Sequence, residues 1–99
     1  MSPAEELKIS KRAVPRTRVE VRRRRYDAQT TWLVSRNDWF ELDELTDQVW
    51  LACDEGLTVE QIAQTISDRS GLAARDALAA TILAIDHFRK LHLVDLDEA

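Results

Sequence analysis

The sequence has few of the residues that cross-link or sharply bend a chain. Its 99 residues include one cysteine, two glycines and two prolines. A single cysteine, Cys53, cannot form an internal disulfide, so the fold must rest on a hydrophobic core. Isolated glycines at 56 and 71 cannot build a glycine-rich loop of the kind that cradles phosphate groups.

Long hydrophobic runs are also missing. No apolar stretch approaches the roughly 18 residues that span a bilayer. The first ten residues, MSPAEELKIS, hold no hydrophobic segment typical of a signal peptide. We therefore expect a cytoplasmic protein with no membrane contact. The 44% hydrophobic and 32% charged residues are ordinary for one small globular domain.

Charge is distributed unevenly along the chain. The net charge is −4, yet residues 1–25 carry nine basic and three acidic residues, and the remainder is strongly acidic. A basic arm on an acidic body is informative about partners rather than about the fold. The arm is suited to attract an acidic peptide, to contact nucleic acid, or to fold back on the body.

The first part of the chain predicts strands. Residues 1–16 show no clear period and contain both prolines, which predicts a flexible basic N-terminal segment ahead of a domain over 17–99. Alternating and β-branched residues then predict three strands. They cover Thr17–Tyr26, Thr31–Arg36 and Trp39–Asp43. A tight turn at Asn37-Asp38 makes them an antiparallel meander.

From Asp43 onward the hydrophobic period changes from two to about 3.6 residues. Helices are predicted over 44–54 with Asp43 as N-cap, over 58–71 with a capping box of Thr58 and Gln61, and over 74–92. Residues 93–96 form a short apolar tail. The core-facing positions are Leu45, Val49, Ala52, Cys53, Ile62, Ile66, Leu78, Thr81, Ile85 and Phe88. The fold class is α+β, a three-stranded antiparallel sheet followed by three helices, resembling a winged helix-turn-helix.

Catalytic chemistry finds no support in the residue pattern. His87 and His92 lie five residues apart on one helix, about 140° around its axis, and are therefore poor joint metal ligands. Cys53 falls on an apolar helix face without a basic neighbour, so it is interpreted as a small buried hydrophobe. We expect no catalytic residue, no metal and no cofactor, and hence a protein that is not an enzyme.

The Arg22–Arg25 run allows three interpretations. On a strand the four side chains alternate between two faces. They can form a charged edge or dock on the body of the protein, attract an acidic peptide, or contact nucleic acid. The same alternation predicts that Phe40 and Leu42 face the core while Trp39 and Glu41 face away.

One flank of the last helix also stands out. Ile82, Asp86 and Arg89 lie roughly 100–160° around the helix from Phe88. An apolar group between opposite charges fits either a plain helix edge or the wall of a groove.

Three stretches carry a resemblance to a known family. They are W-L-V-S-R at 32–36, W-F-E-L-D-E-L-T-D-Q-V-W-L-A-C-D-E-G-L-T-V-E-Q-I-A at 39–63, and H-F-R-K-L-H-L-V at 87–94. Their order and spacing resemble the PqqD-like family, the peptide-recognition domains of ribosomal peptide natural-product pathways. The chain departs from the family pattern where Glu55 separates Asp54 from Gly56. It departs again where His92 stands at a position usually held by glycine.

The resemblance implies non-catalytic binding of a precursor peptide's leader segment. The leader would add as a strand beside the third strand and pack against the third helix. The implied site residues are Asp38, Trp39, Phe40, Glu41, Leu42 and Asp43 on the strand side, and Ile82, Ile85, Asp86 and Arg89 on the helix. The implied partners are the leader peptide and a modifying enzyme, such as a radical S-adenosylmethionine enzyme, a cyclase or a protease. Either a monomer or a homodimer is compatible with this role.

Two other functions compete with this one. A winged-helix DNA-binding regulator would use the basic N-terminal arm, and its affinity would fall steeply with added salt. An assembly module would instead dimerise through exposed apolar surface.

Overall fold

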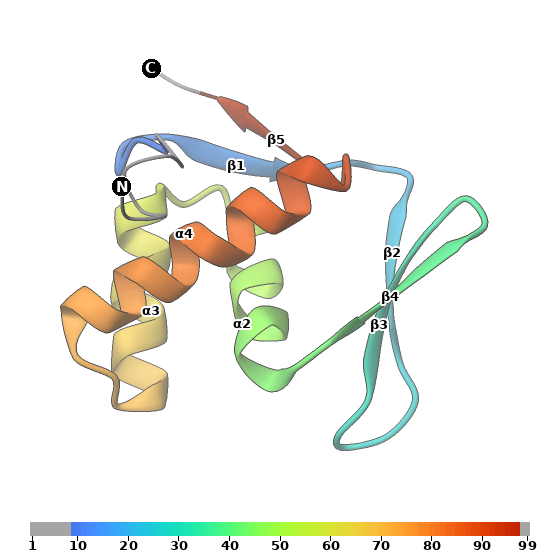
Figure 1. The fold of residues 1–99 in the computed structure, drawn as a ribbon, viewed down its shortest axis with the longest axis horizontal. Coiled ribbons are helices and arrows are strands. Elements are labelled where there is room, and N and C mark those ends of the chain that lie inside the picture. Colours follow the sequence, from blue (N-terminus) through green and yellow to red (C-terminus); the bar gives the residue numbers. More distant parts are fainter. Residues whose placement is uncertain (1–8, 98–99) are drawn as a thin grey trace.

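The computed structural model describes residues 9–97 and confirms an α+β fold (Figure 1). The elements in order are β1 (Val14–Thr17), β2 (Val21–Arg25), β3 (Thr31–Ser35), β4 (Asp38–Leu42), α2 (Glu44–Cys53), α3 (Val59–Ser70), α4 (Ala74–Lys90) and β5 (Val94–Asp97). The helices lie together on one side, with the sheet of β2, β3 and β4 beside them. Strands β1 and β5 pair in a separate ribbon along the top of the view.

The predicted antiparallel meander is confirmed, with shifted bounds. The strand predicted over 17–26 is divided between β1 and β2 by a turn, in which the Val21 N–H donates to the Arg18 carbonyl at 3.1 Å. Val19 alternates like a strand residue but lies in this turn, where it is 99% exposed. The β3–β4 turn comprises Arg36 and Asn37, one residue earlier than predicted, and Asp38 pairs with Ser35.

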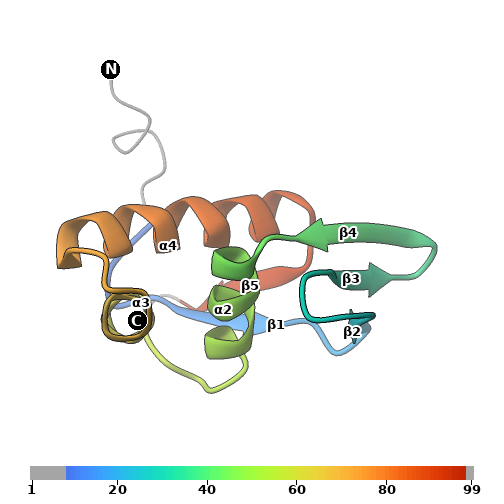
Figure 2. The same ribbon diagram turned by 90° about the horizontal axis from the view of Figure 1, so that it is seen from below.

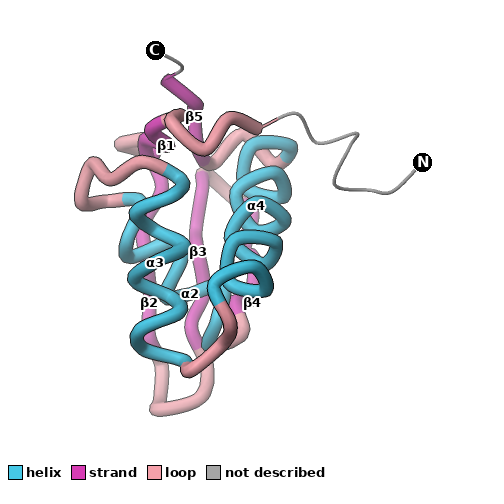
Figure 3. Tube along the Cα trace, turned by 90° about the vertical axis from the view of Figure 1, so that its left-hand side faces the viewer, coloured by secondary structure: helices cyan, strands magenta, loops and turns pink. Residues whose placement is uncertain are grey.

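The core lies between the helices and the inner face of the sheet. Leu33 of β3 and Phe88 of α4 are fully buried, and Trp50 of α2 meets Phe88 edge to face at 5.2 Å. Figure 3 shows α3 and α4 side by side, with the three-stranded sheet behind them. All predicted core residues are buried except two half-buried ones at the core's rim, Leu45 and Leu78.

The predicted helix caps are confirmed. The Asp43 carboxylate accepts the Thr46 N–H at 2.7 Å, and Thr58 and Gln61 form the reciprocal capping box. Because Asp43 directly follows β4, this cap also sets the angle at which the sheet meets α2. Gly71 ends α3 in the left-handed conformation, with φ 79°.

The described part of segment 1–16 packs on the body. Ile9 and Ala13 are buried, and the Ala13 carbonyl accepts the Val59 N–H at 2.9 Å. This bond satisfies a first-turn N–H of α3 that has no partner within the helix. Beyond it, β1 pairs with β5, so neither the lead-in at 14–16 nor the apolar tail at 94–96 is irregular. Residues 1–8 of the predicted flexible segment lie outside the described residues.

The end of α4 determines where β5 runs. The Leu93 N–H donates to the Phe88 carbonyl at 2.9 Å and the His92 N–H donates to the Arg89 carbonyl at 3.0 Å. This is the Schellman pattern, which requires a left-handed residue at the position of His92. His92 has φ 61°, so a histidine occupies the conformation that glycine adopts most easily. Histidine in place of the usual glycine therefore preserves the helix cap, but it strains the backbone at residue 92.

One buried ion pair attaches the sheet to the helices. Asp47 of α2 accepts two hydrogen bonds from the Arg23 guanidinium, at 2.6 and 2.7 Å, and its side chain is only 8% exposed. Arg25 approaches the same carboxylate at 3.9 Å. Thus two of the four consecutive arginines dock on the protein's own body.

Replacing His92 with glycine should stabilise the protein. The left-handed conformation costs a non-glycine residue about 1–2 kcal/mol, whereas glycine loses about 0.5–1 kcal/mol through the entropy of the unfolded chain. We expect His92→Gly to raise the free energy of unfolding by about 0.5–1 kcal/mol in urea titrations. His92→Ala is the control and should give no gain. Equal free energies of unfolding for the wild type and His92→Gly would show that His92 is not strained.

Removing the buried carboxylate should have a larger effect. Asp47→Ala leaves the Arg23 guanidinium half-buried without its partner, and we expect a loss of about 2–4 kcal/mol in unfolding free energy. The double variant Arg23→Ala/Asp47→Ala should lose less than the sum of the single variants, by about 1–3 kcal/mol. Arg22→Ala, on the exposed face of the same strand, is the control and should change little. Strict additivity would show that the pair does not couple α2 to β2.

Candidate functional site

Strand β4 forms an open edge of the sheet. Among residues 9–97, the strand order β2-β3-β4 leaves β2 and β4 with one unpaired side each. At such an edge every second residue points its N–H and C=O groups to the open side, where they can pair with another chain. The two edges differ in what lies beside them. Figures 1 and 2 show α4 and β4 on the same side of the molecule, running in roughly opposite directions, whereas β2 lies farther from α4.

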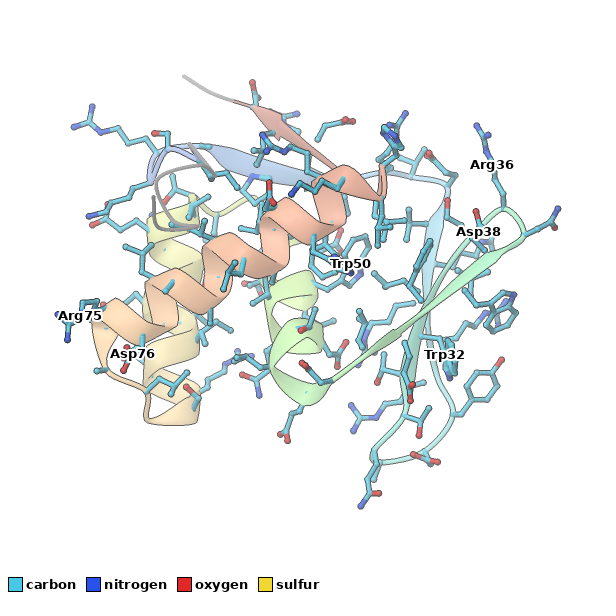
Figure 4. All side chains as sticks on the ribbon, in the orientation of Figure 1. Trp32, Arg36, Asp38, Trp50, Arg75 and Asp76 are labelled. Carbon is cyan, nitrogen blue, oxygen red and sulfur yellow. The ribbon has the colours of Figure 1, made fainter. Side chains whose placement is uncertain are left out.

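A pocket links the beginning of β4 to the end of α4. It has a volume of about 300 Å³ and is polar in character. Its lining residues are Arg18, Glu20, Ser35, Arg36, Asp38, Leu91 and His92. Figure 4 shows Arg36 and Asp38 at the hairpin end of the sheet, on the side where α4 ends. The two elements predicted to form the site therefore share a hollow at one end.

The alternation along β4 is as predicted. Leu42 is buried and Phe40 half-buried on the inner face, and both pair with inward-facing residues of β3. Trp39 is 50% exposed and Glu41 is exposed, on the opposite face. Side chains of a strand added at this edge would alternate in the same way, one set beside Phe40 and the other beside Trp39.

The ten predicted site residues fall into two groups. Some are engaged within the fold: Leu42 and Ile85 are core residues, the Asp43 carboxylate caps α2, and Asp86 is buried. The others keep accessible surface: Asp38, Trp39, Phe40, Glu41, Ile82 and Arg89. The second group has surface that a ligand at this edge could reach, and the first group is part of the fold itself.

Asp86 is buried and ion-paired within α4. Its carboxylate accepts from Arg89 at 2.7 Å and from Lys90 at 3.0 Å, and its side chain is 6% exposed. Burial by itself raises the pKa of Asp86, but hydrogen bonds and charge from Lys90 and Arg89 outweigh it and hold the pKa below its ordinary value. A ligand carboxylate would therefore share Arg89 with Asp86. Lys90 was absent from the predicted site, although its i,i+4 spacing from Asp86 signals the pairing.

The described residues present neither an exposed cysteine nor a cluster of metal-ligating side chains. The Cys53 thiol is buried, and burial raises its pKa to about 12, which makes it unreactive at neutral pH. Within residues 9–97 no three histidine, cysteine, aspartate or glutamate residues gather as a metal site. None of the helices in the described chain is long and apolar enough to cross a membrane. The β4 edge instead presents unpaired backbone groups, with the apolar surface of Phe40 on the strand itself.

Replacing Asp86 with asparagine should lower stability in a pH-dependent way. Because the pKa of Asp86 is lower in the folded state than in the unfolded state, its ionised form stabilises the fold at neutral pH. This contribution is lost as pH falls below about 4, through the folded-state pKa. We expect Asp86→Asn to lose about 1–2 kcal/mol at pH 7 and much less at pH 3, by urea titration. The control Glu55→Gln, in an exposed loop, should show no such convergence, and a constant deficit for Asp86→Asn would contradict the mechanism.

Comparison with known proteins identifies the fold. No protein-family model and no curated protein matches the sequence. The NMR structure of the PqqD part of Methylobacterium extorquens PqqCD, described as a functional stand-alone recognition element for ribosomally synthesised and modified peptides, matches with a TM-score of 0.76. It is 24% identical and covers 92% of this chain and 98% of its own. TbiB1, solved in complex with the TbiA(beta) leader peptide, matches with a TM-score of 0.71 at 15% identity, covering 81% of this chain and 94% of its own. The chain therefore has the PqqD-like fold to which its sequence pattern points.

Proposed function

We propose that this protein binds the leader segment of a ribosomally made precursor peptide as an added strand on β4, facing α4. The observation that carries the proposal is the unpaired β4 edge beside α4. It occurs in a fold shared with TbiB1, which was solved with a leader peptide, and with the PqqD recognition element.

Strand addition lets a small domain hold a peptide along a sheet edge without enclosing it. Main-chain hydrogen bonds to β4 supply affinity for any extended segment, and side-chain contacts select the sequence. Phe40 and Ile82 are half-buried, so each has apolar surface left for a peptide side chain. Arg89 lies in the last turn of α4, seven residues after Ile82. Its guanidinium favours an acidic residue in the leader.

Binding of this kind serves delivery rather than chemistry. A domain that holds the leader and also docks on a modifying enzyme makes the encounter of substrate and enzyme close to intramolecular. The protein would act as a non-catalytic peptide chaperone in the cytoplasm. Its enzyme partner would belong to the radical S-adenosylmethionine, cyclase or protease classes that the family resemblance implies.

The competing DNA-binding function finds less support. A DNA-binding arm needs free cations along its length. In the described part of the arm, Arg16 pairs with Asp97 at 2.7 Å, Arg18 with Glu20 at 3.0 Å, and Arg23 with Asp47. Together with Arg25, which approaches Asp47, they engage four of the eight basic side chains at residues 9–25, so only half of this charge would remain for phosphates.

Truncating the accessible α4 side chains should weaken leader binding. We expect Ile82→Ala/Arg89→Ala to raise the dissociation constant by about tenfold or more, because it removes an apolar contact and a cation from one wall. The probe is a fluorescently labelled leader from the neighbouring precursor gene, measured by anisotropy, with a random DNA duplex for comparison. The matched control is Leu72→Ala/Arg75→Ala, which removes one aliphatic and one arginine side chain from the loop before α4 and from the first turn of α4. Thermal melts establish that both variants fold.

The peptide itself provides a second test. If the leader adds as a strand, N-methylation of the leader backbone should weaken binding at every second position, since only alternate N–H groups face β4. Equal tolerance at all positions would exclude strand addition. Binding to the DNA duplex alone, at physiological salt, would overturn the peptide-binding function.

A further inference from the structure

The outer face of the three-stranded sheet carries an unusual group of side chains. Trp32, Val34 and Trp39 share the face turned away from the helices, since Val34 pairs with Trp39 in the β3–β4 register. Figure 4 shows Trp32 pointing away from the helices, whereas Trp50 lies among them. We name this surface the aromatic–arginine face, and its members are Arg22, Arg24, Tyr26, Trp32, Val34 and Trp39.

Its aromatic rings pack on one another and leave much of their surface in water. Tyr26 stacks on Trp39 with ring centroids 6.3 Å apart, and Trp32 meets Trp39 edge to face at 6.3 Å. Nevertheless Tyr26 is 63% exposed and Trp39 is 50% exposed. A contiguous exposed aromatic cluster of this kind is typical of an interaction surface rather than of ordinary surface packing.

The arginines on this face have no ionic partner in the part of the chain that the structure describes. Arg22 lies opposite Val34 and Arg24 opposite Trp32, both on β2 and both exposed. Within residues 9–97 neither forms an ion pair, in contrast to Arg23 and Arg25 on the inner face. The face thus presents two free guanidinium groups at the margin of an aromatic cluster.

The composition of this face favours a protein as its occupant. Tryptophan, tyrosine and arginine are the residues that dominate binding energy at protein interfaces. A second copy of the chain is disfavoured, because two identical faces would bring Arg22 and Arg24 against like charges. Nucleic acid is disfavoured because Glu41 lies opposite Trp32 on the same face, so a continuous run of phosphates would meet this carboxylate. The acidic groups of a folded protein need face only the β2 margin, where Arg22 and Arg24 lie.

We infer that the aromatic–arginine face docks the enzyme that modifies the bound peptide, through an apolar surface of that enzyme bordered by acidic residues. This inference rests on the proposed leader binding at β4. A leader strand on β4 would extend the sheet and place alternate side chains beside Trp39, so the enzyme would contact the face and the leader together. Bound leader therefore strengthens enzyme binding, and by thermodynamic reciprocity the enzyme strengthens leader binding.

Charge reversal on β2 tests the inference without touching the leader site. The probe is the peptide-modifying enzyme encoded beside the gene of this protein, measured by biolayer interferometry with and without the leader. Arg22→Glu/Arg24→Glu should weaken enzyme binding by about tenfold or more and leave leader affinity within about twofold. Arg12→Glu/Arg75→Glu makes the same change in net charge at the helical end and should bind the enzyme normally. Trp32→Ala is a second, uncharged variant with the same expected loss.

The outcomes separate the two proposals. Unchanged enzyme binding by both Arg22→Glu/Arg24→Glu and Trp32→Ala, with leader affinity intact, would overturn the docking inference alone. A wild-type protein that fails to bind the leader would instead overturn the proposed function. Binding of a single-stranded oligonucleotide that depends on Arg22 and Arg24, or a homodimer abolished by Trp32→Ala in sedimentation, would assign this face to a different occupant and overturn the inference.

Discussion

The attachment of the small sheet to the helices depends on the paired guanidinium and carboxylate of Arg23 and Asp47. A three-stranded meander has little apolar surface of its own, although Leu33 and Leu42 pack into the core. On the β4 side the chain joins the sheet to α2 at the Asp43 cap. The ion pair holds its far strand, β2, against α2. With both sides of the sheet held, the edge of β4 stays open beside α4. A geometry suited to strand addition therefore rests on a contact at the opposite side of the sheet.

The strand period gives one arginine run two different roles. Because successive side chains alternate between faces, Arg23 and Arg25 reach Asp47, while Arg22 and Arg24 project outward beside the tryptophans. The first pair stabilises the fold and the second pair is available to a partner. The same alternation on β4 places Phe40 toward the core and Trp39 toward solvent. The edge proposed for the peptide and the face proposed for the enzyme therefore belong to one hairpin.

The way α4 ends determines the structure beside the beginning of β4. The Schellman turn at His92 sends Leu93 into the core and starts β5, which β1 then covers. His92 also lines the pocket beside Asp38, so the strained residue lies where α4 and β4 approach each other. Segments from both ends of the described chain and from its middle meet there.

The sequence by itself determined the elements whose physics is local. Helix caps such as Asp43 and Thr58, the helical periodicity, and the inward and outward alternation of Phe40 and Trp39 depend on neighbours a few residues away, and all three are correct. Their order and spacing also pointed to the fold. The positions of the residues proposed to bind a peptide rest on the resemblance and on that alternation.

Only the tertiary structure decided the features that join distant segments. The β1–β5 pairing has no periodic signature, since Pro15 interrupts β1 and both strands are four residues long. The burial of Asp86, and the choice of Arg23 over Arg22 as the partner of Asp47, depend on which elements pack against them. These features depend on packing and charge pairing between segments that are distant in the sequence, and local propensity carries no information about such contacts.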